Sequence, residues 1–168
     1  CLKVNEQLID PLKLKSICRD KLSRSTIKLI LNKHATQDVV KNYDFVILCA
    51  YANTNQFLKD KRDSMQEYQF ELVEKVVVKL PSKFNKKSII ILDGPFTCID
   101  PFGKTPYFLM GNVVHAIHST NIGIFPKVPL KFRPLIDKGV IKNPPVTNFK
   151  KFISSAKYFI PEIVEAKH

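Results

Sequence analysis

Glycine is scarce in this sequence, and the glycine-rich motifs of many enzymes are absent. The 168 residues include only 5 glycines, and none of the patterns GxGxxG, GxxxxGK[ST] or GxSxG occurs. The first two patterns build phosphate-binding turns, and the third builds the sharp turn that presents a serine nucleophile. Residues 1–168 therefore contain no recognisable dinucleotide cradle, P-loop or nucleophile elbow.

Arginine is also rare, although the chain is strongly basic. Lysine and arginine total 27 against 15 acidic residues, which leaves a net charge of +12, yet only four of these bases are arginines. Arginine supplies the two-pronged hydrogen bonds that recognise phosphates and base edges. Since the lysines are spread along the chain and no nucleic-acid motif is present, we expect no nucleic-acid partner.

Closely spaced cysteines and long apolar runs are missing as well. Cysteines stand at positions 1, 18, 49 and 98, which excludes the close ligand pairs of zinc fingers and the density of a disulfide scaffold. Cys18 and Cys49 lie within apolar patterns, so we predict that both are buried in a protein of a reducing, cytoplasmic compartment. No apolar run approaches the ~20 residues of a membrane span, so none is expected.

The composition that remains is that of a folded globular protein, with 45% apolar and 25% charged residues. The chain begins at Cys1 without a methionine, and its methionines stand at positions 65 and 110. No apolar segment of signal-peptide type precedes a cleavage site. We therefore expect a piece of a longer protein.

The first third of the chain predicts a helix followed by two strands. Asp10 and Pro11 are typical of a helix start, and apolar residues then recur at helical spacing. Alternation over 27–31 indicates a short strand. The continuous apolar run 45–50 favours a strand buried on both faces, as in a parallel sheet under helices.

The middle of the chain predicts an antiparallel sheet. From 69 to 80 the apolar residues share one parity, which is typical of a long half-exposed strand. We expect further strands over 88–92 and 107–118, with a turn around 100–103 between them. The predicted fold class is α+β, an α/β remnant joined to an antiparallel sheet.

The last part predicts a loop and a closing helix. Five prolines fall within 124–147, which indicates a long stiffened loop of the kind that carries function or covers a site. From 149 to 163 an apolar stripe at helical spacing predicts an amphipathic helix. Pro161 should kink that helix or divide it in two.

Two histidines are the strongest candidates for chemistry from the residues alone. His115 and His118 have a spacing that would suit a metal on a helix, but the surrounding pattern favours a strand, where they would face opposite sides. A structural role is the default for both, and lining a pocket is the main alternative to it. We expect no metal site.

Other chemistry-bearing residues have simpler interpretations. Asp93 and Asp100 bracket the turn-rich segment 94–99 and are expected to be turn residues, not an acid–base pair. Cys98 lies in no recognisable nucleophile motif, so we expect it to be inert. The lysines from 75 to 87 are expected to form a solvated strand face and loop.

Six segments taken in order resemble flavoenzymes of the D-amino-acid oxidase and sarcosine oxidase superfamily. The segments are LIDPLKLKSICRDKL, NKHAT, YDFVILCAYAN, FELVEKVVVKLP, SIIILDGPFTCIDPFGKTPYFLMGN and AKYFIPEIVEA. Each motif is loose alone, and it is their order and spacing that carry the resemblance. The family's glycine-rich nucleotide motif would precede these segments, and its last flavin-contacting segment would follow them.

The resemblance implies a fold, a cofactor and a reaction. It implies part of a Rossmann-like FAD domain over 1–58, a substrate domain with an antiparallel sheet over 59–123, and the Pro-rich loop with the C-terminal helix over 124–168. It further implies hydride transfer from a C–H bond of a small amine or hydroxy acid to FAD, with the cofactor supplying the difficult chemistry.

The resemblance also assigns site residues. Ala35 falls at the family's adenine-side backbone contact, and Cys49, Ala50 and Tyr51 fall at its flavin-side turn, where Tyr51 replaces the usual glycine. For the substrate we expect the strand 107–118, chiefly His115, supported by Tyr107 and His118.

Two other hypotheses remain open. The runner-up is a non-catalytic basic module that binds an anionic partner, and salt dependence would distinguish it. A structural or interaction domain without a ligand is the third. If the first interpretation is right, the isolated piece should expose apolar surface and tend to self-associate.

Overall fold

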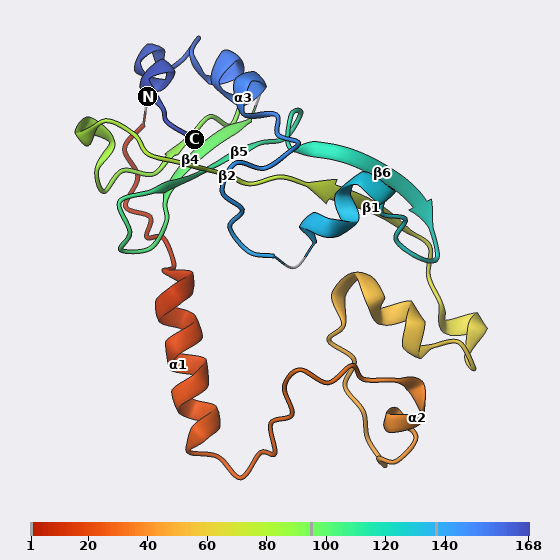
Figure 1. Ribbon diagram of the computed structural model, residues 1–168. Coiled ribbons are helices and arrows are strands. Elements are labelled where there is room, and N and C mark those ends of the chain that lie inside the picture. Colours follow the sequence, from red (N-terminus) through yellow and green to blue (C-terminus); the bar gives the residue numbers. More distant parts are fainter. Residues whose placement is uncertain (1, 95, 137) are drawn as a thin grey trace. The chain divides into compact units, whose positions relative to one another are not determined.

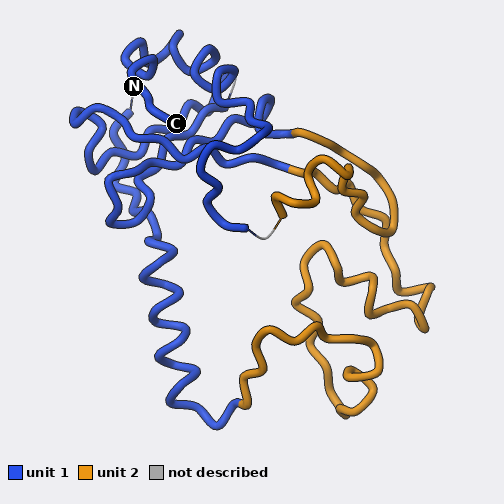
Figure 2. The backbone as a smooth tube through the Cα atoms, in the orientation of Figure 1, with its two compact units in different colours: residues 1–27, 73–117, 138–168 blue, residues 28–72, 118–137 orange. Residues whose placement is uncertain are grey.

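The computed structural model describes residues 2–94, 96–136 and 138–168. Cys1 and Pro95, which both enter the sequence argument, and Asp137 lie outside the described residues. The described chain forms two compact units, each assembled from separate segments (Figure 2). Unit 1 comprises 1–27, 73–117 and 138–168, and unit 2 comprises 28–72 and 118–137. The functional divisions expected at 58/59 and 123/124 stay predictions, because a cofactor domain is defined by what it binds.

A four-stranded sheet forms the centre of unit 1. Its strands run in the order β2-β5-β4-β3, and each neighbouring pair is antiparallel. The strands are β2 (Val76–Val78), β3 (Ile89–Ile90), β4 (Thr97–Pro101) and β5 (Phe108–Asn112). Helices with antiparallel sheet make an α+β fold, as the sequence predicts.

Helix α3 (Phe149–Ala156) packs against β4 and β5 and closes the core of unit 1 (Figure 1). Phe152 and Ala156 of this helix are completely buried. The helix ends before Pro161, which starts the separate 3-10 turn η5 (Pro161–Glu165), so the predicted division at this proline is confirmed. Ten apolar residues form the core cluster: Val76, Val78, Leu80, Phe84, Ile99, Phe108, Met110, Phe152, Ala156 and Ile163.

The strand predicted over 69–80 is divided in the structure. β1 (Tyr68–Val73) pairs with β6 (Ile117–Gly123) in a separate two-stranded sheet, whereas β2 joins the four-stranded sheet. The parity of the apolar residues is kept through the break, because Phe70 and Leu72 are half-buried in β1 and Val76, Val78 and Leu80 are buried after it. The predicted parity of the apolar residues was therefore right, and the prediction of one continuous strand was wrong.

The helix start predicted at Asp10 is confirmed. α1 spans Pro11–Ser23, and the Asp10 carboxylate accepts hydrogen bonds from the backbone N–H groups of Leu12 and Lys13. No described residue of α1 is buried, and Cys18 is exposed, so its predicted burial is wrong. The cap and the local sequence therefore determine this helix, because no described segment buries its apolar stripe.

Unit 2 contains the two-stranded sheet and several short helical turns. These are α2 (Gln37–Val40), η1 (Tyr51–Phe57), η2 (Arg62–Ser64) and η4 (Leu130–Leu135), and unit 1 holds one further turn, η3 (Ser82–Phe84). The buried Asn55 amide donates hydrogen bonds to the carbonyls of Gln66 and Ile124. This single side chain joins three segments that are remote in sequence. Within the Pro-rich stretch, the described residues 124–136 and 138–147 are loop apart from η4.

The strands predicted over 27–31 and 45–50 are absent from the described structure. Both segments are non-helical coil, with Phe45 and Ile47 89–94% exposed and Cys49 also exposed, so the predicted burial is wrong. A strand buried on both faces needs neighbouring strands for its hydrogen bonds and its side chains. No described segment pairs with either of these two.

The remaining strands differ from prediction mainly at their ends. The predicted strand over 88–92 is reduced to β3, and the predicted strand over 107–118 is divided into β5 and β6 by a turn at 113–116. Strand β4 covers part of the segment expected to be a turn, and the chain turns just after it, at Gly103 with φ +56.

The packing of α3 makes a stability prediction. Phe152→Ala should lower the free energy of unfolding of unit 1 by about 3–5 kcal/mol, because it empties a completely buried aromatic site. Urea unfolding followed by circular dichroism measures the change. Tyr158→Ala, at a site 80% exposed just after the same helix, should change stability by less than about 0.5 kcal/mol. Equal losses in the two variants would contradict the described core.

Candidate functional site

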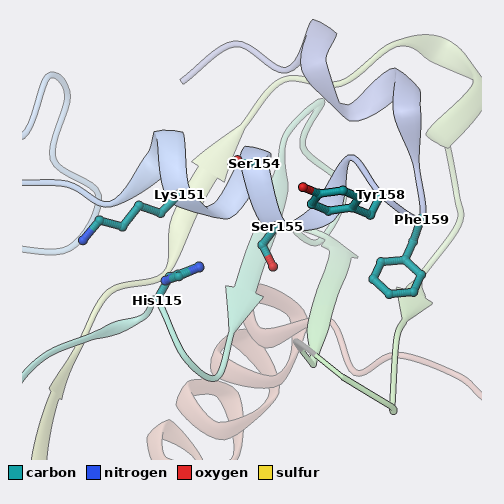
Figure 3. A pocket seen from close by; sticks show the side chains of 6 residues that line it. All are labelled: His115, Lys151, Ser154, Ser155, Tyr158 and Phe159. Carbon is teal, nitrogen blue, oxygen red and sulfur yellow. The ribbon is translucent and has the colours of Figure 1, made fainter.

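An open pocket of about 740 Å³ lies beside α3 in unit 1 (Figure 3). Its lining combines a cation, an imidazole, hydroxyl groups and an aromatic ring in one place. The lining residues are His115, Lys151, Ser154, Ser155, Tyr158 and Phe159. All but His115 come from α3 and the turn that follows it, and His115 comes from the turn after β5.

Asn112, at the end of β5, holds His115 in its place. The Asn112 side-chain oxygen accepts hydrogen bonds from the backbone N–H groups of Val114 at 3.0 Å and His115 at 2.8 Å. The Asn112 backbone oxygen accepts a third from the N–H of Ala116 at 2.9 Å. The turn 113–116 is therefore folded around one buried residue.

The same amide also reaches across to β4 and α3. Its nitrogen donates to the hydroxyl of Thr97 at 3.0 Å and to the hydroxyl of Ser155 at 3.2 Å. An asparagine side chain offers two N–H donors and an oxygen with two lone pairs, so this amide is fully used. Asn112 and Thr97 are at most 3% exposed, and such a satisfied buried network fixes its members relative to one another.

The other side of the turn is fixed from the start of α3. The Asn148 side-chain amide donates to the carbonyl of His115 at 2.8 Å, and the N–H of Glu74 donates to the carbonyl of Ala116 at 2.8 Å. The Glu74 carboxylate accepts from the N–H of Asn148 at 2.8 Å and from the hydroxyl of Thr147. A carboxylate at this helix N-terminus is favoured by the helix dipole.

The pocket joins groups that suit a small polar ligand with an apolar part. Lys151 can neutralise an anion, and the serine and tyrosine hydroxyls can donate or accept hydrogen bonds. The His115 imidazole is half-buried and can donate or accept a hydrogen bond through its ring nitrogens. Both hydrogen bonds to the His115 backbone place this residue at the pocket, which its side chain lines.

The other two predicted substrate residues lie elsewhere. Tyr107 precedes β5, and His115 follows the other end of that strand, so the structure does not bring the two together. His118 lies in β6 of unit 2, where its ring packs against Phe132 with the centroids 5.1 Å apart. Of the three residues, only His115 lines the pocket.

The predicted cofactor residues lie in unit 2. Ala35 is exposed in coil, Cys49 is exposed, and Ala50 immediately precedes η1. Tyr51, the first residue of η1, has φ +50 and a side chain 95% exposed. This backbone conformation favours glycine, and here a tyrosine adopts it.

The structure brings no support to an acid–base pair of Asp93 and Asp100 or to a metal site. Asp93 accepts a hydrogen bond from the N–H of Gly94, and Asp100 accepts one from the hydroxyl of Ser88. These are local structural contacts. Within the described ranges, no group of three or more His, Cys, Asp or Glu side chains is placed to hold a metal ion. No helix in the same ranges is long and apolar enough to cross a membrane.

Comparison with known proteins found no match: no family model, no curated protein and no solved structure is similar to this chain.

Sequence reasoning missed Asn112 and the α3 side of the pocket. Asn112 stands at the end of a strand pattern, where polar residues are common. Its identity therefore did not indicate a buried hydrogen-bond network. Lys151, Ser154 and Tyr158 follow the polar face of the predicted amphipathic helix. Only the packing of that helix on β4 and β5 reveals which part of this face meets His115.

The Asn112 network makes the second prediction. Asn112→Ala should destabilise the chain by about 3 kcal/mol, because it leaves buried hydroxyl and N–H groups without partners. In the same variant, hydrogen exchange of the Val114 and His115 backbone amides should accelerate, because both lose their acceptor. Ser155→Ala removes one of these bonds and should cost only about 1 kcal/mol. Unchanged exchange at His115 in the Asn112 variant would contradict its role in holding the turn.

Proposed function

We propose that residues 1–168 form the substrate-side part of a flavin-dependent oxidoreductase. The reaction is oxidation of a C–H bond in a small amine or hydroxy acid, with FAD as the hydride acceptor. The observation that carries the proposal is the position of His115, which Asn112 and Asn148 hold on both sides at an open pocket. This is the residue to which the family resemblance assigns the substrate.

The lining of the pocket supports this substrate class. Lys151 and the hydroxyls of Ser154 and Tyr158 offer partners for the polar groups of such a molecule, and Phe159 offers an apolar contact. His115 would orient the substrate by a hydrogen bond. Steric fit at this pocket would then decide which amine or hydroxy acid is oxidised.

The flavin side of the proposal depends on the turn at 49–51. With φ +50, Tyr51 has the backbone conformation that a glycine at a close-contact turn would have, so the main chain fits a backbone contact to the cofactor. Ala35, Cys49 and Ala50 would contribute further main-chain contacts. Residues 1–168 lack the glycine-rich turn that holds a pyrophosphate at a helix N-terminus, so we expect this chain alone to bind FAD weakly or not at all.

We further propose a reducing, cytoplasmic environment for this enzyme. Cys18, Cys49 and Cys98 are all free thiols in the structure. Proteins of oxidising compartments usually use their cysteines in disulfides.

The third prediction tests the substrate assignment. In a flavin-loaded protein that includes residues 1–168, His115→Ala should lower kcat/KM by ~10²-fold through loss of substrate positioning, with flavin content unchanged. Val114→Ala alters an exposed neighbour in the same turn and should retain normal turnover. Stopped-flow reduction of the flavin without oxygen measures the relevant step directly. Normal turnover in the His115 variant would remove the assignment.

The exposed apolar segments generate the fourth prediction. Residues such as Phe45 and Ile47 are 89–94% exposed, and apolar surface of this kind favours association of two copies of the chain. Sedimentation velocity should show an associated species whose fraction increases with protein concentration. Phe45→Glu together with Ile47→Lys should reduce that fraction. A monomer at every concentration in the unaltered chain would contradict this expectation.

A second candidate function is a basic module for an anionic partner. The net charge of +12 and the presence of Lys151 in the pocket favour it. Binding of polyanions with a defined stoichiometry that persists at high salt would support this function over the oxidoreductase. Binding that weakens steeply as the salt concentration rises would instead indicate the general electrostatic attraction of a lysine-rich surface.

A further inference from the structure

Lys75, Cys98 and Gly111 meet on the four-stranded sheet of unit 1. Cys98 of β4 is the direct partner of Gly111 in β5, and Lys75 immediately precedes β2, whose first residue Val76 pairs with Met110. The amine Nζ of Lys75 lies 4.0 Å from the thiol Sγ of Cys98. None of these residues lines the His115 pocket.

The missing side chain of Gly111 makes this contact possible. A Cβ atom at Gly111 would lie 2.5 Å from the Cys98 Sγ and 2.8 Å from the Lys75 Nζ, which is closer than packed atoms can approach. Gly111 is not among the residues with positive φ, so the backbone there does not itself require a glycine. The glycine provides space, and the amine and the thiol share it.

Both groups are accessible to a small reagent. Cys98 is half-buried, Lys75 is exposed, and Cys98 forms no disulfide. A thiol that is oxidised to a sulfenic acid becomes an electrophile, and a nearby nucleophile then attacks its sulfur. For Cys98 that nucleophile is the amine on the flexible Lys75 side chain.

We propose that Lys75 and Cys98 form a reversible covalent cross-link, a sulfenamide, when a peroxide oxidises the thiol. Hydrogen peroxide transfers one oxygen atom to Sγ, which loses two electrons, and the peroxide is reduced to water. The neutral Lys75 amine then attacks Sγ. The S–N bond forms as the S–O bond breaks, and the departing hydroxide takes the amine proton and leaves as a second water.

The cross-link would join β4 covalently to the segment that leads into β2, across the intervening β5. An added dithiol reverses it by attacking the sulfur and releasing the amine. The inference depends only on this geometry and not on the proposed oxidoreductase function.

The test is a peptide map of the full chain after treatment with hydrogen peroxide. We expect a cross-linked peptide pair that contains residues 75 and 98, lighter than the sum of its parts by two hydrogen atoms and released by dithiothreitol. Lys75→Arg keeps the positive charge and removes the nucleophilic amine, so the pair should disappear. Lys104→Arg changes an exposed lysine at the other end of β4 and should leave the pair intact.

A reagent that traps sulfenic acids, such as a cyclic 1,3-diketone, provides the second readout. In Lys75→Arg, Cys98 should be trapped in higher yield than in the unaltered chain, because the competing amine is gone. The proposal is overturned if Cys98 of the unaltered chain accumulates as a sulfenic or sulfinic acid without the cross-link. It is equally overturned if Cys98 stays reduced while Cys18 and Cys49 are oxidised.

Discussion

One buried amide organises the pocket of unit 1. The Asn112 side chain uses both of its N–H donors and both lone pairs of its oxygen within the protein. It thereby joins β4, β5, the turn that carries His115 and the helix α3. Because a buried amide that loses a partner is costly, these four elements are held in one arrangement.

The pocket follows from this constraint. α3 brings Lys151 and its neighbouring hydroxyls to one side, and the turn brings His115 to the other. Glu74 completes the arrangement from the opposite end, since its carboxylate receives the N-terminus of α3 while its N–H binds the end of the turn. The polar network specifies where the side chains lie, and the apolar core beneath α3 supplies most of the stability.

Local signals in the sequence were sufficient for some elements and not for others. The Asp10 cap, the shared parity of Val76 and Val78 in β2 and the interruption at Pro161 act over a few residues, and each was predicted. The segments 27–31 and 45–50 have strand composition, but a strand needs partners that local sequence cannot supply. The site was predicted in part: His115 was a candidate, whereas Asn112 and Lys151 acquire their roles only from packing between remote segments.

The most direct test of the proposed oxidoreductase is to read the coding sequence on both sides of residues 1–168. We expect a continuous frame with a strand and a GxGxxG turn upstream, which would supply the pyrophosphate site that these residues lack. We also expect a glycine- and arginine-containing flavin segment after His168. A frame that starts directly before Cys1 and stops after His168 would contradict the account, and the basic binding module would then be the function to test.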